Sequence, residues 1–401
     1  MKILMLCNKS PWPPVEGGPM AMEAMASGLM EARHQVKILA INSNKYHTDL
    51  KDIPETFREQ TGIEFVEIDL SIKPFPALFS LIKGTSYHVE RFITPDFARA
   101  LEQILIKDNY DIIQFETLFT SPYIELIRKY SQAKLILRAH NIEHLIWERI
   151  SKGTRNPLKR FYLRRLAKAL GDYEKQTLRK LDGVVAITDV DAKWFRQAFP
   201  QLPVVSIPFG IDAGDGEEDL TTIEPKVKGL FHLGSMNWMP NQEGIRWFLN
   251  EVWPGLRKQF PDLTFSLAGR SMPQWLLQNK QPGVIVDGEV ADARSYMLDH
   301  QIMVVPLFSG SGIRIKIIEG MLMGKTVITT PVGAEGIHYV DGEHLLIARD
   351  TAGFMDAVTF CINHPLAARQ MGIAGRKLVL YKHDNQMLMQ ILTEFYQGKP
   401  G

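Results

Sequence analysis

The chain has 401 residues, with 46 Lys and Arg against 45 Asp and Glu, which gives a formal net charge of +1. At roughly 100–200 residues per domain, this length predicts two or three domains. Hydrophobic residues make up 45% and charged residues 23% of the chain, which excludes a mainly disordered, collagen-like or disulfide-scaffold protein. The near-neutral charge provides no bulk attraction to nucleic acid, so we expect no nucleic-acid partner.

The sequence has two cysteines, Cys7 and Cys361, in apolar segments near opposite ends of the chain. We expect buried free thiols, which suit a reducing cytoplasm. There is no cysteine cluster that could bind a metal, and no HExxH, Walker loop or GxSxG motif occurs. We therefore expect neither a bound metal nor a nucleophilic residue.

The hydropathy pattern predicts neither a membrane span nor an export signal. No apolar run approaches the roughly 18–20 residues that cross a bilayer. The apolar stretch from Ile3 to Cys7 is shorter than the roughly 7–15 residues of a signal-peptide core, and Pro-rich sequence follows it. We interpret it as a buried first strand and expect a cytoplasmic protein that can reach the inner face of the membrane.

In the first half of the chain, apolar runs of strand length alternate with helical stretches. The helix predicted over 19–33 carries Met22, Met25, Ala26 and Leu29 on one face. Strands alternating with helices favour a parallel, doubly wound sheet. The predicted strands are 2–7, 35–41, 62–68, 111–115, 134–138, 183–187 and 204–207, and a second helix is predicted over 96–107.

The same alternation starts again after a polar, acidic stretch at 211–225, which we interpret as a hinge. We therefore predict an α/β protein with two Rossmann-like domains whose parallel sheets face a cleft. The first domain is predicted over 1–212, with a C-terminal helix at about 384–401 packing back on it, and the second over 213–383. In the second, the predicted strands are 228–233, 264–268, 284–286, 303–307, 326–330 and 345–347, and the helices are 241–259, 292–298, 313–323 and 352–363.

Residues 10–20 (SPWPPVEGGPM) join the first strand to the first helix. Prolines restrict the path of this loop, and Gly17 and Gly18 let the backbone approach a ligand. The helix that follows directs the partial positive charge of its N-terminus to the same place, which suits a phosphate. A tight strand-to-helix turn without a ligand explains the segment equally well, and the GxGxxG fingerprint is not met.

Residues 304–336 combine a glycine loop, two cations and a carboxylate. Gly310, Ser311 and Gly312 precede a predicted helix with Arg314 in its first turn and Lys316 two residues later. Two cations at a helix N-terminus oppose the helix dipole, and a bound diphosphate offsets this. Glu319, on the same face as Lys316, can accept hydrogen bonds from the two hydroxyls of a ribose. The alternative is a solvated amphipathic helix with an incidental Lys316–Glu319 pair.

Polar residues follow two of the predicted strands. His140, Asn141 and Glu143 come directly after the apolar run that ends near 138, and Glu116 ends the run DIIQFE. The carboxyl ends of parallel strands line the crevice in which such sheets bind ligands. The alternatives are a capping or core histidine at His140 and a helix cap or loop residue at Glu116.

A basic segment covers 152–180, with ten Lys and Arg against Asp172 and Glu174. A basic amphipathic helix is typical of a surface that contacts anionic membrane or a polyanion. The alternative is a solvated helix whose apolar stripe faces its own core. The predicted stripe consists of Phe161, Leu163, Leu166 and Leu170.

Taken together, these motifs resemble the retaining nucleotide-sugar glycosyltransferases of the GT-B fold, specifically family four, over nearly the whole chain. The strongest match is SGSGIRIKIIEGMLMGKTVITTPVGAEGI. The order and spacing of weaker matches support it. These are the loop with Gly17 and Gly18, HLGSMNWMPNQEGIRWF with Gly234, SLAGR ending at Arg270, DGEV ending at Val290, and SIPFGID.

The resemblance implies that the first domain binds the acceptor and the second the nucleotide-sugar. It implies that Glu319 holds the ribose hydroxyls and that 310–312 lie near the donor sugar and phosphates. Further donor-binding positions that it implies are Gly17, Gly18 and Gly234, with Arg270 and Val290 beside the base. Glu116, His140 and Asn141 match positions on the acceptor side.

The sequence departs from the family pattern in ways that suggest a variant site. Many members have a glutamate at the position of Ser311, and many place Arg and Lys near Ser235 and Asn241. We expect Arg314 and Lys316 to bind the diphosphate instead. This pattern resembles a subgroup with G-S-G-x-R-x-K-x-x-E.

The resemblance implies transfer of a sugar from a nucleoside-diphosphate sugar, of UDP or GDP type, to an acceptor hydroxyl with retained anomeric configuration. The expected catalytic residues are Arg314, Lys316 and Glu319, with no cofactor and no metal. The expected partners are the donor, a saccharide or lipid-linked acceptor from polysaccharide or glycolipid synthesis, and anionic membrane contacted through 152–180. The alternatives are a nucleotide-sugar epimerase and a non-catalytic cytoplasmic nucleotide-sugar-binding protein.

Overall fold

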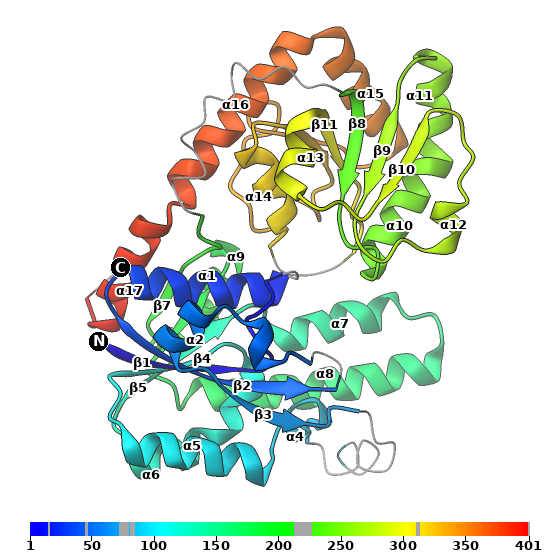
Figure 1. Cartoon of the computed structure of the whole chain (residues 1–401). Coiled ribbons are helices and arrows are strands. Elements are labelled where there is room, and N and C mark those ends of the chain that lie inside the picture. The colour runs from blue at the N-terminus through cyan, green and yellow to red at the C-terminus, as the bar shows by residue number, and fades with distance from the viewer. Residues whose placement is uncertain are drawn as a thin grey trace. The chain divides into compact units, whose positions relative to one another are not determined.

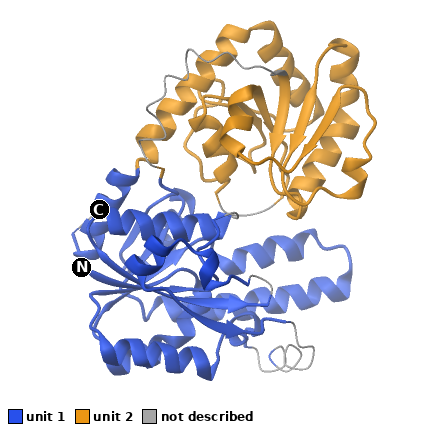
Figure 2. Ribbon diagram, in the orientation of Figure 1, with its two compact units in different colours: residues 1–210, 385–401 blue, residues 211–384 orange. Residues whose placement is uncertain are grey.

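The computed structural model describes residues 1–14, 17–44, 47–71, 80, 85–211, 227–309 and 313–399. The chain forms two compact units (Figure 2). Unit 1 consists of 1–210 and 385–401, and unit 2 of 211–384. Within the described ranges, no helix is long and apolar enough to cross a membrane.

Unit 1 is built on a seven-stranded parallel sheet with the order β3-β2-β1-β4-β5-β6-β7. Its central strands are apolar on both faces, as strands of a parallel sheet covered by helices are. In β1, every residue from Ile3 to Cys7 is fully buried. The strands are β1 (Lys2–Cys7), β2 (Gln35–Ser43), β3 (Glu64–Ile68), β4 (Ile112–Phe115), β5 (Lys134–Ala139), β6 (Gly183–Ala186) and β7 (Val204–Ser206).

Helices cover both faces of this sheet. On one face, Met22 and Leu29 of α1 share a hydrophobic cluster with Leu388 and Leu392 of α17, so the end of the chain packs on unit 1 (Figure 1). The helices are α1 (Gly17–Glu31), η1 (Leu50–Asp52), α2 (Glu55–Thr61), α4 (Tyr87–Glu90), α5 (Pro95–Lys107), η2 (Leu118–Tyr123), α6 (Ile124–Tyr130), α7 (Glu143–Gly153), α8 (Pro157–Leu178), α9 (Asp189–Ala198) and α17 (Asn385–Tyr396).

Unit 2 is built on a six-stranded parallel sheet with the order β10-β9-β8-β11-β12-β13. Its core is rich in aromatic side chains, among them Phe248, Trp253, Phe265 and Phe354. The strands are β8 (Val227–Leu233), β9 (Phe265–Ala268), β10 (Val284–Gly288), β11 (His300–Val305), β12 (Thr326–Thr329) and β13 (Leu346–Ile347). The helices are α10 (Met239–Trp247), η4 (Phe248–Val252), α11 (Trp253–Gln259), α12 (Gln274–Leu277), α13 (Ala293–Asp299), α14 (Ile315–Leu322), α15 (Thr351–Asn363) and α16 (Pro365–Lys382).

In both sheets the strand order reverses at one point. It lies between β1 and β4 in unit 1 and between β8 and β11 in unit 2. Ligands of such sheets bind outside the carboxyl ends of the strands beside this point. In unit 1, Lys9 and Glu116 follow the carboxyl ends of β1 and β4 at this point. In unit 2, Gly234 and Pro306 follow the carboxyl ends of β8 and β11.

The structure confirms the predicted α/β class with two Rossmann-like parallel sheets. The predicted strands agree with the observed ones to within a few residues, and Cys7 and Cys361 are free and buried, as expected. The helix predicted over 241–259 forms in three parts, because the π-helical turn η4 separates α10 from α11. Pro254, the second residue of α11, has no N–H to donate to the preceding turn, which disfavours regular α-helix there.

The basic segment 152–180 is not one helix. α7 ends at Gly153, and α8 starts at Pro157, behind the N-cap residue Asn156. The predicted apolar stripe is correct for Leu163, Leu166 and Leu170, which are buried, and wrong for Phe161, which is 63% exposed. The buried face of α8 turns toward α7, so these two helices form a hairpin (Figure 1).

Candidate functional site

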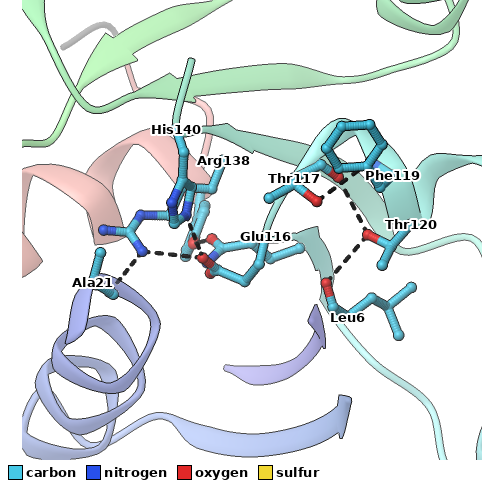
Figure 3. Close-up of polar contacts among 10 residues, drawn as sticks. Leu6, Ala21, Glu116, Thr117, Phe119, Thr120, Arg138 and His140 are labelled. Carbon is cyan, nitrogen blue, oxygen red and sulfur yellow. Dashed lines mark hydrogen bonds and ion pairs between the residues drawn. The ribbon is translucent and has the colours of Figure 1, made fainter. Parts of the chain in front are cut away.

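The carboxyl ends of β4 and β5 bring Glu116 and His140 together (Figure 3). His140 Nε2 lies 3.1 Å from Glu116 Oε2. Arg138 Nη1 donates to the same oxygen at 3.0 Å, and Gln114 Nε2 donates to Oε1 at 2.5 Å. Glu116 is completely buried, and Thr117, not Glu116, caps the helical turn that follows. Glu116 is therefore an ion-paired buried carboxylate rather than a cap.

Burial and neighbouring charges set the protonation of this pair. Burial alone raises the pKa of Glu116, but the charge of Arg138 and the hydrogen bond to His140 together leave it below its usual value. Burial lowers the pKa of His140, and Glu116 offsets this only in part. At neutral pH the pair is therefore a carboxylate beside a neutral imidazole. When Nε2–H donates to Glu116, Nδ1 remains available to accept a proton from a hydroxyl.

Arg138 holds this arrangement in place. It is 1% exposed, and its Nη1 atom also donates to the backbone oxygen of Ala21 in α1 at 2.7 Å (Figure 3). From the sequence alone, Arg138 is only the end of a predicted strand, with no expected role. An arginine inside the apolar run LILRA was the sequence feature that could have revealed this role. A buried cation needs an anionic partner, so such an arginine predicts a nearby carboxylate.

Asn141 lies next to a second buried acidic group, formed by Glu143 and Glu174. Its side chain forms a hydrogen bond with Glu143, whose backbone N–H donates to Glu174 Oε1 at 3.2 Å. His144 Nδ1 contacts the other oxygen of Glu174. Burial, and to a lesser degree the charge of Glu174, raise the pKa of Glu143 to about 8, so Glu143 is protonated at neutral pH. The sequence placed Glu143 beside His140 but did not reveal Glu174 on α8 as its neighbour.

Gly17 and Gly18 open α1, and Gly18 leaves space for Lys9. A Cβ atom on Gly18 would lie 2.9 Å from Lys9 Cε and 3.0 Å from Nζ. Burial, and to a lesser degree the charges of Arg138 and Lys9, lower the pKa of His140. Lys9 was not singled out from the sequence, yet it brings a cation to the N-terminus of α1, on the same edge of the sheet as His140.

In unit 2, Lys316 is held by Asn241 of α10 and lies beside His232 of β8. Its Nζ atom donates to Asn241 Oδ1 at 2.6 Å and lies 3.5 Å from His232 Nε2. A Cβ atom on Gly234 would lie 2.7 Å from the same Nζ, so Gly234 leaves the space that the ammonium occupies. Asn241 is itself oriented by Nδ2, which donates to the backbone oxygen of Ser235 at 2.7 Å. In the sequence, Ser235 and Asn241 appeared only as replacements for Arg and Lys. In the structure they position Lys316 of α14.

The sequence predicted Arg314 in the first turn of α14. In the structure Arg314 lies one position earlier, at the N-cap of the helix. The helix starts at Ile315, so Lys316 is its second residue. Arg314 is 4% exposed, and its guanidinium carbon lies 5.5 Å from the ring centre of Trp238, the N-cap of α10. Arg314 and Lys316 therefore both lie at the N-terminus of α14, where the helix dipole also attracts an anion.

Burial has opposite effects on the two charged residues of α14. Burial and the charge of Arg314 lower the pKa of Lys316 to about 7. Burial raises the pKa of Glu319, and Lys316 partly opposes this. Each of the two charges offsets the effect of burial on the other only in part. An anion beside Lys316 would restore its charge, because an opposite charge favours the protonated amine.

The remaining donor-side predictions lie at the ends of β9 and β10. The Nε atom of Arg270 forms an ion pair with Glu289 Oε1 at 3.0 Å at the surface, and Val290 is half-buried. Gly269 has a φ of +146°, and a Cβ atom there would lie 1.9 Å from the backbone oxygen of Gly234. The backbones after β8 and β9 are thus packed directly together, which brings Arg270 to the same edge as Gly234.

Three predicted residues, Gly310, Ser311 and Gly312, lie outside the described residues. In the part of the chain that the structure describes, no group of three His, Cys, Asp or Glu side chains is placed to hold a metal ion. The candidate groups are therefore Lys9, Glu116 and His140 in unit 1, and Arg314, Lys316 and Glu319 in unit 2.

Two family models match the chain. Residues 15–215 match the model described as glycosyltransferase family 4, and residues 227–364 match that of glycosyl transferases group 1. A curated relative from Klebsiella pneumoniae, an uncharacterized 44.6 kDa protein in the cps region, is 24% identical over 272 residues. That match covers 63% of this chain and 66% of the relative's length.

Solved structures share the whole fold at low sequence identity. Sucrose-phosphate synthase from Thermosynechococcus elongatus is 17% identical with a TM-score of 0.71, and the match covers 99% of both chains. Anabaena HepE in complex with UDP-glucose is 16% identical with a TM-score of 0.65, covering 99% of this chain and 100% of that one. Staphylococcus aureus TarM, in complex with fondaparinux, α-GlcNAc-glycerol and UDP, is 11% identical with a TM-score of 0.66, covering 98% and 99%. The chain therefore belongs to glycosyltransferase family 4 and has the GT-B fold.

Proposed function

We propose that this protein transfers a sugar from a nucleoside-diphosphate sugar, of UDP or GDP type, to a hydroxyl of a saccharide or lipid-linked acceptor, with retention of the anomeric configuration. We place the reaction in cell-surface polysaccharide or glycolipid synthesis, in the cytoplasm. Similar structures hold UDP-glucose or UDP, and the Klebsiella relative is named for the cps region, which supports this assignment.

The observation that carries the proposal is the pair of cations at the N-terminus of α14. Lys316 is fixed by Asn241 at 2.6 Å, and Arg314 lies beside it at the N-cap. Two cations with a helix dipole form a site for a dianionic group such as a diphosphate. Glu319, one turn further, is suited to accept hydrogen bonds from the ribose hydroxyls of the same nucleotide.

In this mechanism the bond between the anomeric carbon and the diphosphate oxygen breaks, and its electron pair stays on that oxygen. The acceptor oxygen bonds to the anomeric carbon from the same face, and its proton passes to the departing diphosphate. Arg314, Lys316 and the helix N-terminus stabilise the charge that develops, so neither a cofactor nor a metal ion is needed. Removing one such donor typically costs about 3 kcal/mol of transition-state stabilisation, or roughly a hundredfold in rate.

Unit 1 would orient the acceptor. The neutral His140, held by Glu116 at 3.1 Å, can accept a hydrogen bond from the reacting hydroxyl. Asn141 and the protonated Glu143 can bind further acceptor hydroxyls. We also propose peripheral contact with anionic membrane through 152–180, which would bring the protein to a lipid-linked acceptor.

The test begins with nucleotide binding. Thermal unfolding is measured with UDP, GDP, ADP and CMP, for the wild type and for Arg314→Ala with Lys316→Ala. A ligand at roughly 100 times its dissociation constant adds about 2.7 kcal/mol to the free energy of unfolding. We expect one diphosphate to stabilise the wild type and to lose this effect in the double variant. Stabilisation by none of the four would contradict the donor assignment.

Turnover is then measured with UDP- and GDP-sugars, with and without a glycolipid extract and with EDTA. We expect acceptor-dependent release of nucleotide that EDTA leaves unchanged, and a product linkage of the donor's anomeric configuration by NMR. Sugar conversion without acceptor would instead indicate an epimerase, and binding without turnover a non-catalytic protein. Near-normal turnover in both single variants, Arg314→Ala and Lys316→Ala, would show that these residues are not the diphosphate site.

A further inference from the structure

A cavity of about 200 Å³ lies between α8 and residues 80 and 85–87, at the start of α4. α4 follows β3, and its residue Val89 shares a small hydrophobic cluster with Leu118, which follows β4, and with Leu170 of α8. Because β3 and β4 are parallel, the cavity lies at the carboxyl end of the unit 1 sheet. This is the end that also carries Glu116 and His140.

The lining of the cavity combines polar and apolar groups and carries two cations. Arg165 and Lys168 contribute their charges from α8, and Tyr162 and Asp172 lie on the same side of the helix, about one turn before and one turn after them. Ser86 lines the cavity from the other side. The lining therefore offers cations that can bind a phosphate, and a carboxylate that can accept a hydrogen bond from a hydroxyl.

Ser86 provides independent evidence for a ligand. It is 6% exposed, and among the described residues its hydroxyl has no hydrogen-bond partner. It stands at the N-cap of α4, but its side chain makes no capping hydrogen bond. A buried hydroxyl without a partner costs free energy, and a phosphate oxygen in the cavity would satisfy it.

The surface next to the cavity is apolar and basic. Leu158 is 81% exposed, and Phe161 is 63% exposed, with the Arg165 guanidinium 6.0 Å from its ring. The chain contains no acidic residue between Glu148 and Asp172. Exposed apolar side chains among basic residues are typical of a segment that lies in the interface of an anionic membrane.

We propose that the cavity between α4 and α8 binds the phosphate-bearing, hydroxylated headgroup of an anionic phospholipid while Leu158 and Phe161 enter the acyl region. Arg165 and Lys168 bind the phosphate, the Ser86 hydroxyl donates to it, and Asp172 accepts from a headgroup hydroxyl. The hairpin of α7 and α8 is then a lipid-recognising element and not merely a charged surface. This site is separate from the cations of α14, so it can be tested without any donor sugar.

The test is co-sedimentation of the full-length protein with vesicles of phosphatidylcholine, alone or with about one third phosphatidylglycerol, at roughly 0.15 M salt. We expect at least tenfold tighter binding to the vesicles that contain phosphatidylglycerol. Arg165→Ala with Lys168→Ala should lose this preference by about tenfold, and Ser86→Ala by a few-fold. Leu158→Ser with Phe161→Ser should abolish vesicle binding.

The matched control is Lys129→Ala with Lys193→Ala, which removes the same charge from exposed positions on α6 and α9 of unit 1. We expect it to change vesicle binding by less than twofold. Equal losses in the two double variants would overturn the proposal, because bulk charge would then explain the binding. So would equal binding to both vesicle types, or displacement from vesicles by millimolar glycerol phosphate, which would identify a soluble phosphate as the ligand. Thermal unfolding and UDP stabilisation of each variant report folding and nucleotide binding separately.

Discussion

The ammonium of Lys316 makes nucleotide binding depend on pH. Burial and the charge of Arg314 lower its pKa to about 7 in the free protein. A bound diphosphate raises this pKa again, because a nearby negative charge favours the protonated amine. The protein is therefore expected to take up a proton when it binds a nucleoside diphosphate at or above pH 7.

The size of the effect follows from the protonated fraction. If only the charged form binds the diphosphate, the apparent affinity is reduced in proportion to that fraction. With a pKa of about 7, roughly half of the molecules carry the charge at pH 7, and about 3% carry it at pH 8.5. UDP should then bind about fifteen-fold more weakly at pH 8.5 than at pH 7. The phosphate itself adds little to this change, because its second pKa is near 6.

The assay is isothermal titration calorimetry of UDP at both pH values, in two buffers with different heats of ionisation. Proton uptake should rise from about half a proton at pH 7 to nearly one at pH 8.5. Lys316→Met is the control: its UDP binding should be weak and nearly independent of pH. The variant should remain folded, because the substitution removes an amine that is costly to bury. Wild-type affinity that changes less than twofold, without proton uptake, would refute the placement of Lys316 on the diphosphate.

Four further predictions concern single residues. Glu319→Gln should weaken UDP binding roughly tenfold, since hydrogen bonds to a charged group contribute about 1.5–3 kcal/mol. In a competition assay the variant should also lose the preference for UDP over 2′-deoxy-UDP. An unchanged preference would show that Glu319 does not bind the ribose hydroxyls. Arg138→Met should lower the free energy of unfolding by about 3–5 kcal/mol in urea, because it leaves the buried carboxylate of Glu116 without its cationic partner, and a loss below about 1 kcal/mol would contradict this. In the wild type, Glu116 has a lowered pKa, so its contribution to stability should be present above its usual pKa and lost as the pH falls through the lowered value. Gly234→Ala should weaken UDP binding about tenfold with little change in Tm, because the new Cβ would displace the flexible Lys316 side chain. Normal UDP affinity would show that binding does not require the Lys316 ammonium beside Gly234.

The local patterns of the sequence predicted much of the fold. The alternation of apolar runs with helical stretches predicted two parallel sheets, because strands buried on both faces are apolar throughout their length. The glycine loop followed by Arg314, Lys316 and Glu319 predicted a helix with cations at its start, and α14 forms there. Spacing of three or four residues encodes which side chains share a helix face, and this information is local.

The sequence was less informative where a side chain's partner lies elsewhere in the chain. From the sequence, Glu116 was considered without Arg138 and Glu143 without Glu174, although the structure places each pair in contact. The prediction that Phe161 belongs to the buried stripe was wrong. A helical pattern shows which residues line up, but the neighbouring helix α7 decides which of them are covered.

The sequence by itself determined the α/β class, the position of the strands and the family to which the chain belongs. Each of these rests on residues close together in the chain or on motifs in a characteristic order. Only the tertiary structure decided that Asn241 orients Lys316, 75 residues away, and that Arg138 joins Glu116 to the backbone of α1. The physical reason is that strand order and helix packing bring distant residues into contact. Burial at those contacts then sets the charge each residue carries.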